Sequence, residues 1–536
     1  MFRKPEPCVE IAYHDNTSFV VRPKSLPRMK HLTLSALFQQ VGLRRKYVIA
    51  LNDVSRVYVW CKKHKIECRD MLEPVKKLIN KPLKKQECPE RLTKTKLWNS
   101  LYPYQREGVT LAITKHFGKC LLADDMGLGK TYQALTFIDY YRDQTPILIV
   151  CPSYLRCHWV QECERIGLDA YRIKSKKDKV QGTLWVISYD MIKAFAWLKP
   201  MMVIADESHY IKNRKSQRSV AFLKVVRSAR YRLLLTGTPA LNRPIEFFTQ
   251  MFALRPKYVQ HYSWYAKRYC NAKMTHFGFD DRGVSNPNEL SWLLKQKYMV
   301  RRLKRDVLTQ LPSKTRREIH IQVDKLGRIK KLQRELKVIN KSIHSMSGEE
   351  QQRKHFERKA LISELFRETA RVKAKNVAKW ILDRLDAYDE KIVFFGYHQV
   401  MLDMVEEMCA SVDKIRIDGS TSTENRQAYV DRFQEDPKVR LAVLSLMAAG
   451  TGLTLTASST VVFGEMYWVP GVILQAEDRC HRISQTKPVT IYYLLGSDTI
   501  DSYIHPVLDK KLKILDNITD QRSDRTLKEN IIDFIV

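Results

Sequence analysis

Short apolar runs alternate with helical patterns in two separate parts of the chain. In the first part the runs cover residues 121–123, 147–150, 185–187 and 202–205. In the second part they cover residues 392–395, 441–444 and 461–463. Apolar runs of this length, separated by helical segments, are typical of buried parallel strands. The pattern therefore predicts an α/β protein with two lobes, each built on a parallel sheet.

The segments outside these lobes have a different pattern. The N-terminal part holds two strand-like runs, at 47–51 and 57–60, followed by a helical pattern at 68–79. Between the lobes the alternation stops and the pattern is helical. The expected organisation is an N-terminal module at 1–98, lobe 1 at 99–295, a helical insert at 296–375, lobe 2 at 376–505 and a helical C-terminal tail at 506–536.

An excess of basic residues separates this chain from an average globular protein. The chain has 93 Lys and Arg against 58 Asp and Glu, a formal net charge of +35, while its 44% hydrophobic content is ordinary. Residues 1–98 hold 22 basic and 9 acidic residues, and residues 297–375 hold 23 and 9. This excess favours a polyanionic partner, either a nucleic acid or an anionic membrane surface. The composition excludes a mainly disordered, collagen-like or disulfide-stapled chain.

The cysteines and the apolar segments indicate in which cellular compartment the protein is found. Eleven cysteines without a CxxC pair fit reduced thiols inside a cell. The clusters around Cys61 and Cys151 lack the paired spacing of zinc ligands. The N-terminus lacks the apolar core of a signal peptide, and the uncharged segment 441–464 is broken by Ser, Thr and Gly. We expect a soluble intracellular protein with no membrane partner.

The segment 124–131, which we name the phosphate loop, carries the most specific motif. It follows an apolar run and precedes a helical pattern, which is the context that a phosphate-binding loop requires. Its glycines let backbone N–H groups turn toward phosphates, Lys130 would reach the β- and γ-phosphates, and Thr131 would hold Mg²⁺. The first glycine of the strict motif is replaced by Asp124. The residues expected to bind nucleotide are Asp125, Met126, Gly127, Leu128, Gly129, Lys130 and Thr131.

Two acidic residues follow the apolar run at 202–205. Asp206 and Glu207 end this run, and acidic groups at the end of a buried strand are costly unless they are used. Asp206 would position Mg²⁺, and Glu207 would orient and deprotonate an attacking water. The alternative is a surface Asp-Glu turn, which would not require a phosphate loop earlier in the chain.

Four motifs now stand in an order that is found in a family of molecular motors. They are DMGLGKT at 125–131, DESH at 206–209, LTGTP at 235–239 and QAEDRCHR at 475–482. The set resembles the helicase motifs of the Swi/Snf-type superfamily 2 ATPases, most of all their HepA-related annealing-helicase branch. The resemblance extends over about residues 101–515. It implies two tandem RecA-like lobes with ATP bound in the cleft between them.

The resemblance also implies further site residues. Gln105 matches the glutamine that contacts adenine, although a surface residue at a helix N-terminus is the plainer alternative. Gly452 matches a second-lobe loop that couples nucleotide to DNA, or it is simply a turn. Arg479 and Arg482, three residues apart, would share one face of a helix and reach the γ-phosphate when the lobes close. A solvated helix face would also accommodate two arginines. The chain departs from the family at Val469 and Ser484, and we expect these changes to affect coupling more than hydrolysis.

These features predict an ATP-dependent DNA translocase that remodels or rewinds branched DNA, with ATP and Mg²⁺ as cofactors. Its expected partner is duplex DNA, forked DNA or a junction of single and double strands. A reduced HARP-like module within 47–79 would recognise branched DNA, and a generic α/β cap is an equal alternative. A nucleosome remodeller, the motor of a transcription or restriction system, and a catalytically silent DNA-binding scaffold are the alternative functions.

Further expectations concern partners and location. A single-strand-binding protein or chromatin is an additional candidate partner, and we expect a monomer. The family and the basic runs indicate the nucleus in a eukaryote and the cytoplasm otherwise.

Overall fold

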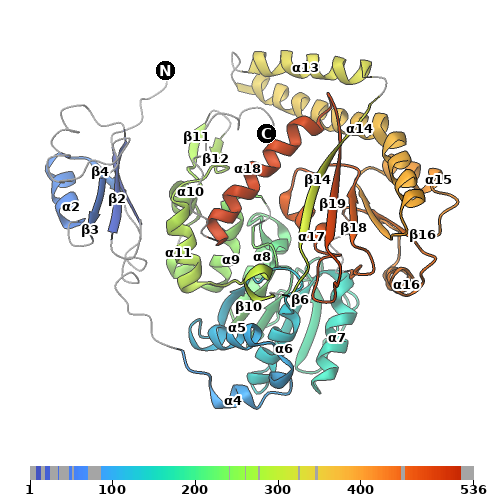
Figure 1. Ribbon diagram of the computed structural model, residues 1–536. Helices are drawn as coiled ribbons and strands as arrows, with labels where there is room; N and C mark the ends of the chain where they lie inside the picture. The colour runs from blue at the N-terminus through green and yellow to red at the C-terminus, as the bar shows by residue number, and fades with distance from the viewer. Residues whose placement is uncertain are drawn as a thin grey trace.

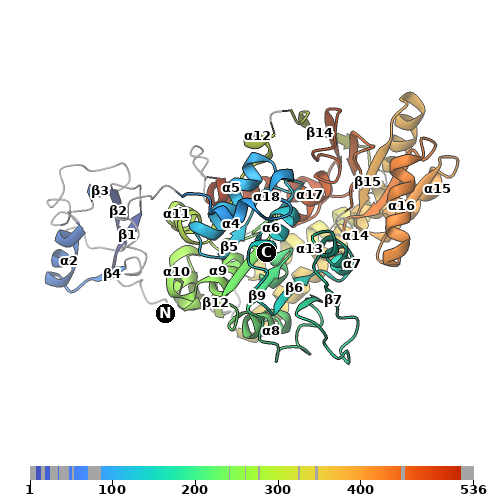
Figure 2. The same cartoon turned by 90° about the horizontal axis from the view of Figure 1, so that it is seen from below.

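The computed structural model describes most of the chain. The described residues are 8–13, 18–24, 34, 47–50, 54–69, 86–240, 242–259, 261–275, 278–308, 310–323, 326–343, 348–447 and 453–520. They form two large lobes and a small N-terminal module that stands to one side in both views (Figures 1 and 2).

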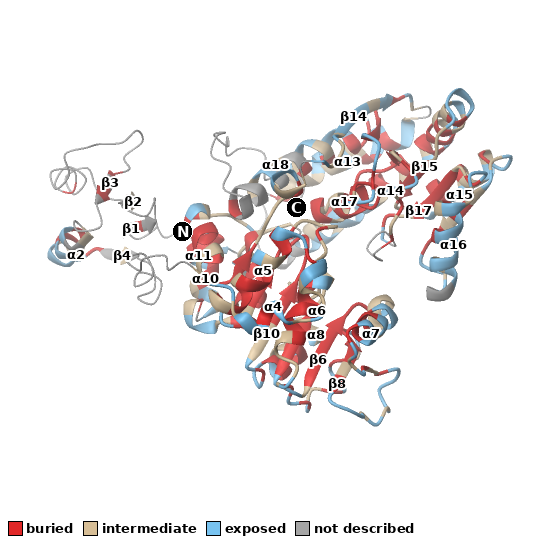
Figure 3. Cartoon of the chain, turned by 60° about the horizontal axis from the view of Figure 1, so that its bottom comes forward, coloured by how far each residue is buried: buried red, intermediate tan, exposed pale blue. Residues whose placement is uncertain are grey.

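Lobe 1 is built on a parallel sheet of seven strands. Their order across the sheet is β13 (Met299–Val300), β5 (Lys119–Leu122), β10 (Tyr231–Leu235), β9 (Met202–Ala205), β6 (Ile147–Cys151), β8 (Leu184–Ser188) and β7 (Tyr171–Arg172). The central strands are almost entirely apolar and buried, because helices cover both faces of the sheet (Figure 3).

The helices of lobe 1 follow the strands in α/β order. They are α4 (Glu90–Thr93), α5 (Pro103–Thr114), α6 (Lys130–Tyr140), α7 (Arg156–Arg165), α8 (Gln217–Val226), α9 (Phe247–Leu254), α10 (Tyr262–Tyr269) and α11 (Pro287–Lys297). A hairpin of β11 (Lys273–Thr275) and β12 (Gly278–Asp280) lies between α10 and α11. One face of the sheet packs on α5, α6 and α7, and the other packs on α8 and α9.

Lobe 2 is built on a second parallel sheet, of six strands. Their order is β14 (Lys314–Ile321), β19 (Val489–Gly496), β18 (Thr460–Phe463), β15 (Ile392–Gly396), β17 (Leu441–Ser445) and β16 (Lys414–Ile417). Its helices are α13 (Gly327–Ile343), α14 (Gly348–Ala387), α15 (Gln399–Met408), α16 (Thr423–Glu435), α17 (Pro470–Glu477) and α18 (Asp501–Asp520). The prediction of an α/β fold with two parallel sheets is confirmed.

The segment between the lobes differs in part from its predicted helical structure. The helices α12 (Lys304–Val307), α13 and α14 are present, but β13 and β14 are strands. β13 joins the sheet of lobe 1, and β14 forms the edge of the lobe 2 sheet beside β19. The prediction of a helical segment at 296–375 is therefore wrong at these two strands. β14 is a mostly exposed edge strand, which needs no apolar run, and β13 is buried but only two residues long.

The N-terminal module contains a four-stranded sheet and a helix. The strands are β1 (Cys8–Tyr13), β2 (Ser18–Lys24), β3 (Tyr47–Ala50) and β4 (Glu67–Arg69), and the helix is α2 (Val54–Lys63). The strand predicted at 47–51 is confirmed by β3. The strand predicted at 57–60 is wrong, because Val57, Trp60 and Cys61 lie on the buried face of α2 at helical spacing while Val59 is exposed. The helix predicted at 68–79 is wrong at its start, which belongs to β4, and residues 70–79 lie outside the described residues.

A hydrogen bond from a buried arginine of lobe 1 connects this module with lobe 1. The Arg268 guanidinium lies 2.5 Å from the Glu289 carboxylate, and both side chains are almost fully buried. The same guanidinium donates a hydrogen bond to the carbonyl of Ile11 in β1 (2.6 Å), and Tyr269 donates to Glu289. A side chain of lobe 1 therefore completes its hydrogen bonds on the backbone of the module.

Helix α18 runs from lobe 2 back to lobe 1 (Figure 1). Near its start Asp501 pairs with the buried Lys373, and near its end Ile518 is fully buried in the same apolar cluster as residues of α9 and α11. Within the described residues, no helix is long and apolar enough to cross a membrane.

Candidate active site

The phosphate loop connects β5 with α6 and is shaped by two glycines. Gly127 and Gly129 adopt φ angles of +81° and +71°, in the left-handed region that favours glycine. A Cβ atom on Gly129 would lie 2.3 Å from the Nε2 atom of Gln105. The loop therefore requires glycine at 129, and it leads directly into the N-terminus of α6.

Lys130 lies over the backbone of this loop. Its ammonium group donates hydrogen bonds to the carbonyls of Asp124 (2.8 Å) and Asp125 (3.1 Å). A Cβ atom on Gly237, in the LTGTP segment, would lie 3.4 Å from Lys130 Nζ and 2.2 Å from the side chain of Met126. Burial lowers the pKa of Lys130, and the negative charge of Glu207 opposes this effect. The structure thus brings three of the four sequence motifs together around one ammonium group.

Asp124 has a structural role in the position where the strict motif has glycine. Its buried carboxylate accepts hydrogen bonds from the backbone N–H of Arg302 (3.0 Å), from Arg302 Nε (2.9 Å) and from Gln133 Nε2 (2.9 Å). Asp125 is held similarly, by an ion pair with Arg301 (3.2 Å). Residues just after β13 therefore hold the loop. The sequence did not identify these two arginines as residues that hold the loop, because no local pattern connects them with it.

Asp206 and Glu207 follow the end of β9, which is separated from β5 by β10, and the charges of both act on Lys130 of the phosphate loop. Asp206 accepts hydrogen bonds from Trp159 Nε1 (3.0 Å) and from the backbone N–H of Glu207 (2.9 Å). Burial and the charge of Glu207 raise the pKa of Asp206 to about 6. Burial also acts to raise the pKa of Glu207, but His209, 3.2 Å away, and Lys130 together lower it. The two adjacent carboxyl groups therefore have pKa values shifted in opposite directions, as acid and base groups in active sites often do.

The residues present fit a nucleotide with Mg²⁺. The glycines leave a cradle that side chains would otherwise fill, and the loop continues into the positive end of the α6 dipole. Thr131 in the first turn of α6 and the carboxylate of Asp206 supply the oxygen ligands that Mg²⁺ prefers.

Gln105 lies at the third position of α5 and is buried, so the surface alternative is wrong for this residue. Its Oε1 atom accepts a hydrogen bond from the backbone of Tyr102 (2.9 Å), and its Nε2 atom donates to the carbonyl of Leu128 (3.0 Å). Gln105 therefore contacts the phosphate loop directly, and Leu128 itself is fully buried.

Lobe 2 contributes the segment 478–482, which we name the arginine turn. Helix α17 ends at Glu477, so Arg479 and Arg482 lie in a turn and the prediction that they share a helix face is wrong. Glu477, the last residue of this helix, is completely buried and pairs with Lys314 and Arg316 of β14. Both arginines nevertheless face lobe 1: a Cβ atom on Gly127 would lie 3.3 Å from Arg482 Cγ, and the charge of Arg479 acts on Glu207.

Burial also changes the pKa of a side chain in the arginine turn. Burial and the nearby charge of Arg479 lower the pKa of Arg482 to about 9. Arg482 also donates a hydrogen bond to the Thr454 hydroxyl (2.7 Å). A second contact between the lobes joins Gln475 Nε2 to the Thr238 hydroxyl (3.0 Å). The lobes are therefore closed on each other, with the arginine turn against the phosphate loop.

Comparison with known proteins agrees with this geometry. Residues 104–376 match the model of the SNF2-related domain, and residues 373–484 match that of the helicase conserved C-terminal domain. The chain belongs to the SNF2-related family of helicase-like ATPases. The resemblance stated from the motifs is thereby confirmed, and membership of this family implies binding of ATP.

Two curated relatives and one solved structure are among the proteins similar to the chain. The SWI/SNF-related matrix-associated actin-dependent regulator of chromatin subfamily A-like protein 1 of Xenopus tropicalis is 36% identical over 90% of this chain and 53% of its own length. The human DNA annealing helicase and endonuclease ZRANB3 is 39% identical over 80% of this chain and 41% of its own. The chain spans about half the length of these relatives. The SWI2/SNF2 ATPase core of Sulfolobus solfataricus in complex with dsDNA aligns with 78% of this chain and 92% of its own, at 23% identity and a TM-score of 0.37.

Two further sequence predictions concern Gly452 and the cysteine clusters. Gly452 lies outside the described residues. In the described part of the chain, no group of three or more His, Cys, Asp and Glu side chains is placed to hold an ion.

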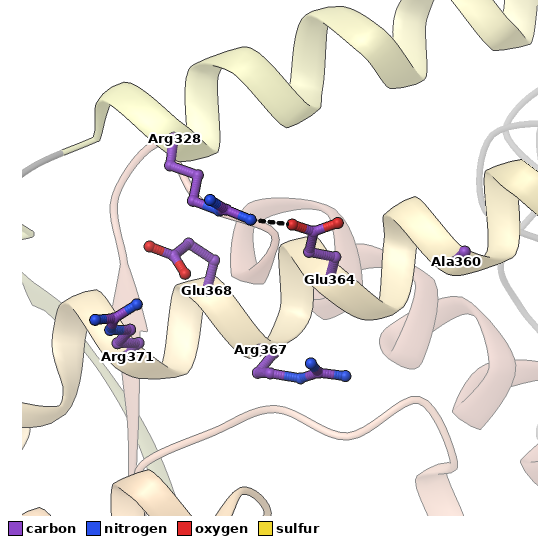
Figure 4. Close-up of a pocket in the computed structure, with 6 residues that line it drawn as sticks. All are labelled: Arg328, Ala360, Glu364, Arg367, Glu368 and Arg371. Carbon is purple, nitrogen blue, oxygen red and sulfur yellow. Dashed lines mark hydrogen bonds and ion pairs between the residues drawn. The ribbon is translucent and has the colours of Figure 1, made fainter.

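A pocket also lies away from the cleft, between α13 and α14 (Figure 4). It is lined by Arg328, Ala360, Glu364, Arg367, Glu368 and Arg371. Arg328 pairs with Glu364 across it, and Arg367 points away from Arg328. None of the predicted site residues lines this pocket.

Proposed function

We propose that the protein is an ATP-dependent DNA translocase that remodels or rewinds branched DNA. The observation that carries this proposal is the closed cleft, in which Arg482 of lobe 2 lies against Gly127 of the phosphate loop. Such an arrangement has chemical use only if something binds between the lobes. A scaffold without activity would have no need of Lys130, Asp206, Glu207 and the arginine turn together.

Each residue has a role in this proposal. Lys130 and the loop from Asp125 to Gly129 hold the phosphates, and Gln105 contributes to binding of the base. Thr131 and Asp206 hold Mg²⁺, which when bound neutralises charge on the β- and γ-phosphate oxygens. Glu207, kept ionised beside His209, orients the attacking water and accepts its proton.

The arginine turn supplies positive charge from the opposite side of the cleft. Arg482, and Arg479 beside Glu207, would stabilise charge that develops on the transferred phosphoryl group. A residue of this kind is typically worth about 10³ to 10⁵ in rate, which is roughly 4 to 7 kcal/mol. Because the arginines belong to lobe 2 and the phosphate loop to lobe 1, hydrolysis is coupled to closure of the lobes.

DNA is the proposed track of this motor. The net charge of +35 and the basic residues of the N-terminal module and of 297–375 favour a phosphate backbone. Relatives named as DNA annealing helicases favour DNA over other polyanions. Binding to forked DNA is expected to weaken steeply as the salt concentration rises.

The test is ATP hydrolysis by the purified chain without DNA and with single-stranded, duplex, forked and nucleosomal DNA. We expect the strongest stimulation by forked DNA, and its loss in Lys130→Ala, because this variant lacks the ammonium group that contacts the phosphates. A melting curve of the variant controls for folding. No stimulation by any DNA at low salt with Mg²⁺ would overturn the proposal in favour of the scaffold.

A nucleosome remodeller is the second candidate function. It is favoured by relatives that are named as regulators of chromatin. Preferential stimulation by nucleosomes in the same assay would support it over fork remodelling. We further propose a monomer that acts in the nucleus, with a single-strand-binding protein or chromatin as an additional partner; light scattering and localisation of a tagged chain test these points.

A further inference from the structure

We infer that Lys304 is a positioning residue that fixes the arginine turn against the phosphate loop. The inference rests on the proposed function, since it assigns how the proposed arginines are oriented. Lys304 is the first residue of α12, in the segment that leaves lobe 1 after β13. Only 7% of its surface is exposed, which is unusual for a lysine and indicates that its ammonium group is used.

Toward lobe 1, Lys304 is bound to the phosphate loop through its backbone and its stem. Its backbone N–H donates a hydrogen bond to Asp125 Oδ2 (3.1 Å). Its Cε atom lies 3.7 Å from the position that a Cβ atom on Gly127 would occupy, next to Arg482. A displacement of the loop therefore displaces Lys304 with it.

Toward lobe 2, the ammonium group of Lys304 holds the arginine turn at two points. It donates a hydrogen bond to the carbonyl of His481 (2.6 Å) and pairs with Asp478 Oδ1 (3.1 Å). Asp478 directly precedes Arg479, and His481 directly precedes Arg482. One ammonium group therefore fixes the backbone immediately before each arginine.

A second lysine shows what is particular to Lys304. Lys314 Nζ lies 3.1 Å from the same Asp478 oxygen. Lys314 belongs to β14, so its contact with Asp478 lies within lobe 2 and does not connect the arginine turn with the phosphate loop. Because Lys314 still neutralises Asp478, removal of the Lys304 charge does not leave a buried carboxylate unpaired. The turn keeps its fold and loses its connection with lobe 1.

The test compares Lys304→Met, which keeps the length of the stem and removes the charge, with Lys304→Arg and Arg305→Met. Arg305 is an exposed neighbour that pairs only with Asp306 among the described residues and serves as the matched control. We expect kcat for DNA-stimulated hydrolysis to fall about 10²-fold in Lys304→Met, as for other misplaced catalytic groups. KM for ATP should change less than about threefold, since uniform binding is retained. Lys304→Arg should recover part of kcat, and Arg305→Met should behave as the wild type.

A double variant separates positioning from a general structural effect. Lys304→Met should cause a much smaller loss in an Arg482→Ala background than in the wild type under single-turnover conditions, because one of the two arginines through which Lys304 acts is then absent. Losses that multiply, or a fall in melting temperature that accounts for the lost activity, would overturn the inference.

Hydrogen exchange tests the same inference without catalysis. Peptides that cover 125–131 and 478–482 should exchange faster together in Lys304→Met but not in Arg305→Met. If exchange rises in neither or in only one of them, the inference is wrong. Should the wild type show no DNA-stimulated hydrolysis, the proposed function fails, while this exchange measurement still decides the role of Lys304.

Discussion

The lobe 1 side of the cleft is assembled within its own lobe, whereas the lobe 2 side depends on a residue from outside its lobe. The phosphate loop is fixed by its glycines and by the buried contact of Asp124 with Arg302 after β13. The arginine turn follows the end of α17 and is fixed toward lobe 1 by Lys304. We therefore call the lobe 1 side preformed and the lobe 2 side conditional, because the second is completed by a contact between the lobes. The proposed coupling of lobe closure to hydrolysis requires such a difference.

The largest expected effect on kcat comes from substituting Arg482, which belongs to the conditional side. Arg482→Ala should lower kcat by about 10³- to 10⁵-fold, since the positive charge that reaches the phosphate loop is lost. ATP affinity, measured with a fluorescent nucleotide, should change little because lobe 1 is intact. Arg353→Ala, at a highly exposed position on α14, is the control. A large loss of affinity in Arg482→Ala would show that the two sides are not independent.

A substitution on the preformed side should lower the free energy of unfolding. Arg302→Met leaves the buried carboxylate of Asp124 without its cationic partner, which is expected to cost about 3 to 5 kcal/mol of unfolding free energy. Urea denaturation measures this cost. The double variant Asp124→Asn with Arg302→Met should recover part of it, because no buried charge is left. Equal instability of the single and double variants would contradict an electrostatic origin.

The smallest effect is a pH dependence on the lobe 1 side. The pKa of Asp206 is raised to about 6, so its carboxylate is lost as the pH falls through that value. The proposed Mg²⁺ ligand is the charged form, and kcat/KM should therefore decline on the acid side with a midpoint near 6, approaching tenfold per unit below it. The midpoint should persist in Arg482→Ala, measured on its residual activity. Its disappearance in that variant would assign the titration to the lobe 2 side.

The sequence predicts the preformed side better than the conditional one. Apolar strands and a loop rich in glycine are local patterns, so both sheets and the course of the phosphate loop could be read from them. The pairing of Asp124 with Arg302 joins residues 178 positions apart, and no local pattern indicates it. Glu477, the last residue of α17, pairs with Lys314 and Arg316 of β14, which lie 163 and 161 positions earlier, and no local pattern shows that the arginines leave the helix.

The wrong strand and helix predictions have the same origin. β14 lies at a sheet edge and its side chains are mostly exposed, so it carries no apolar run. Residues 57–60 are nearly all apolar, and only their neighbours at 54 and 61 indicate the helical spacing of α2. Short apolar runs cannot distinguish a strand from one turn of a buried helix.

The return of α18 to lobe 1 has a consequence for biosynthesis. Ile518, near the end of this helix, is fully buried among residues that the ribosome completes more than two hundred positions earlier, such as Leu254 and Leu290. Lobe 1 therefore emerges first with an uncovered apolar site and completes its core only after lobe 2 has been translated. The nascent chain must keep that site from aggregating during this interval, either by its own interim structure or with a chaperone.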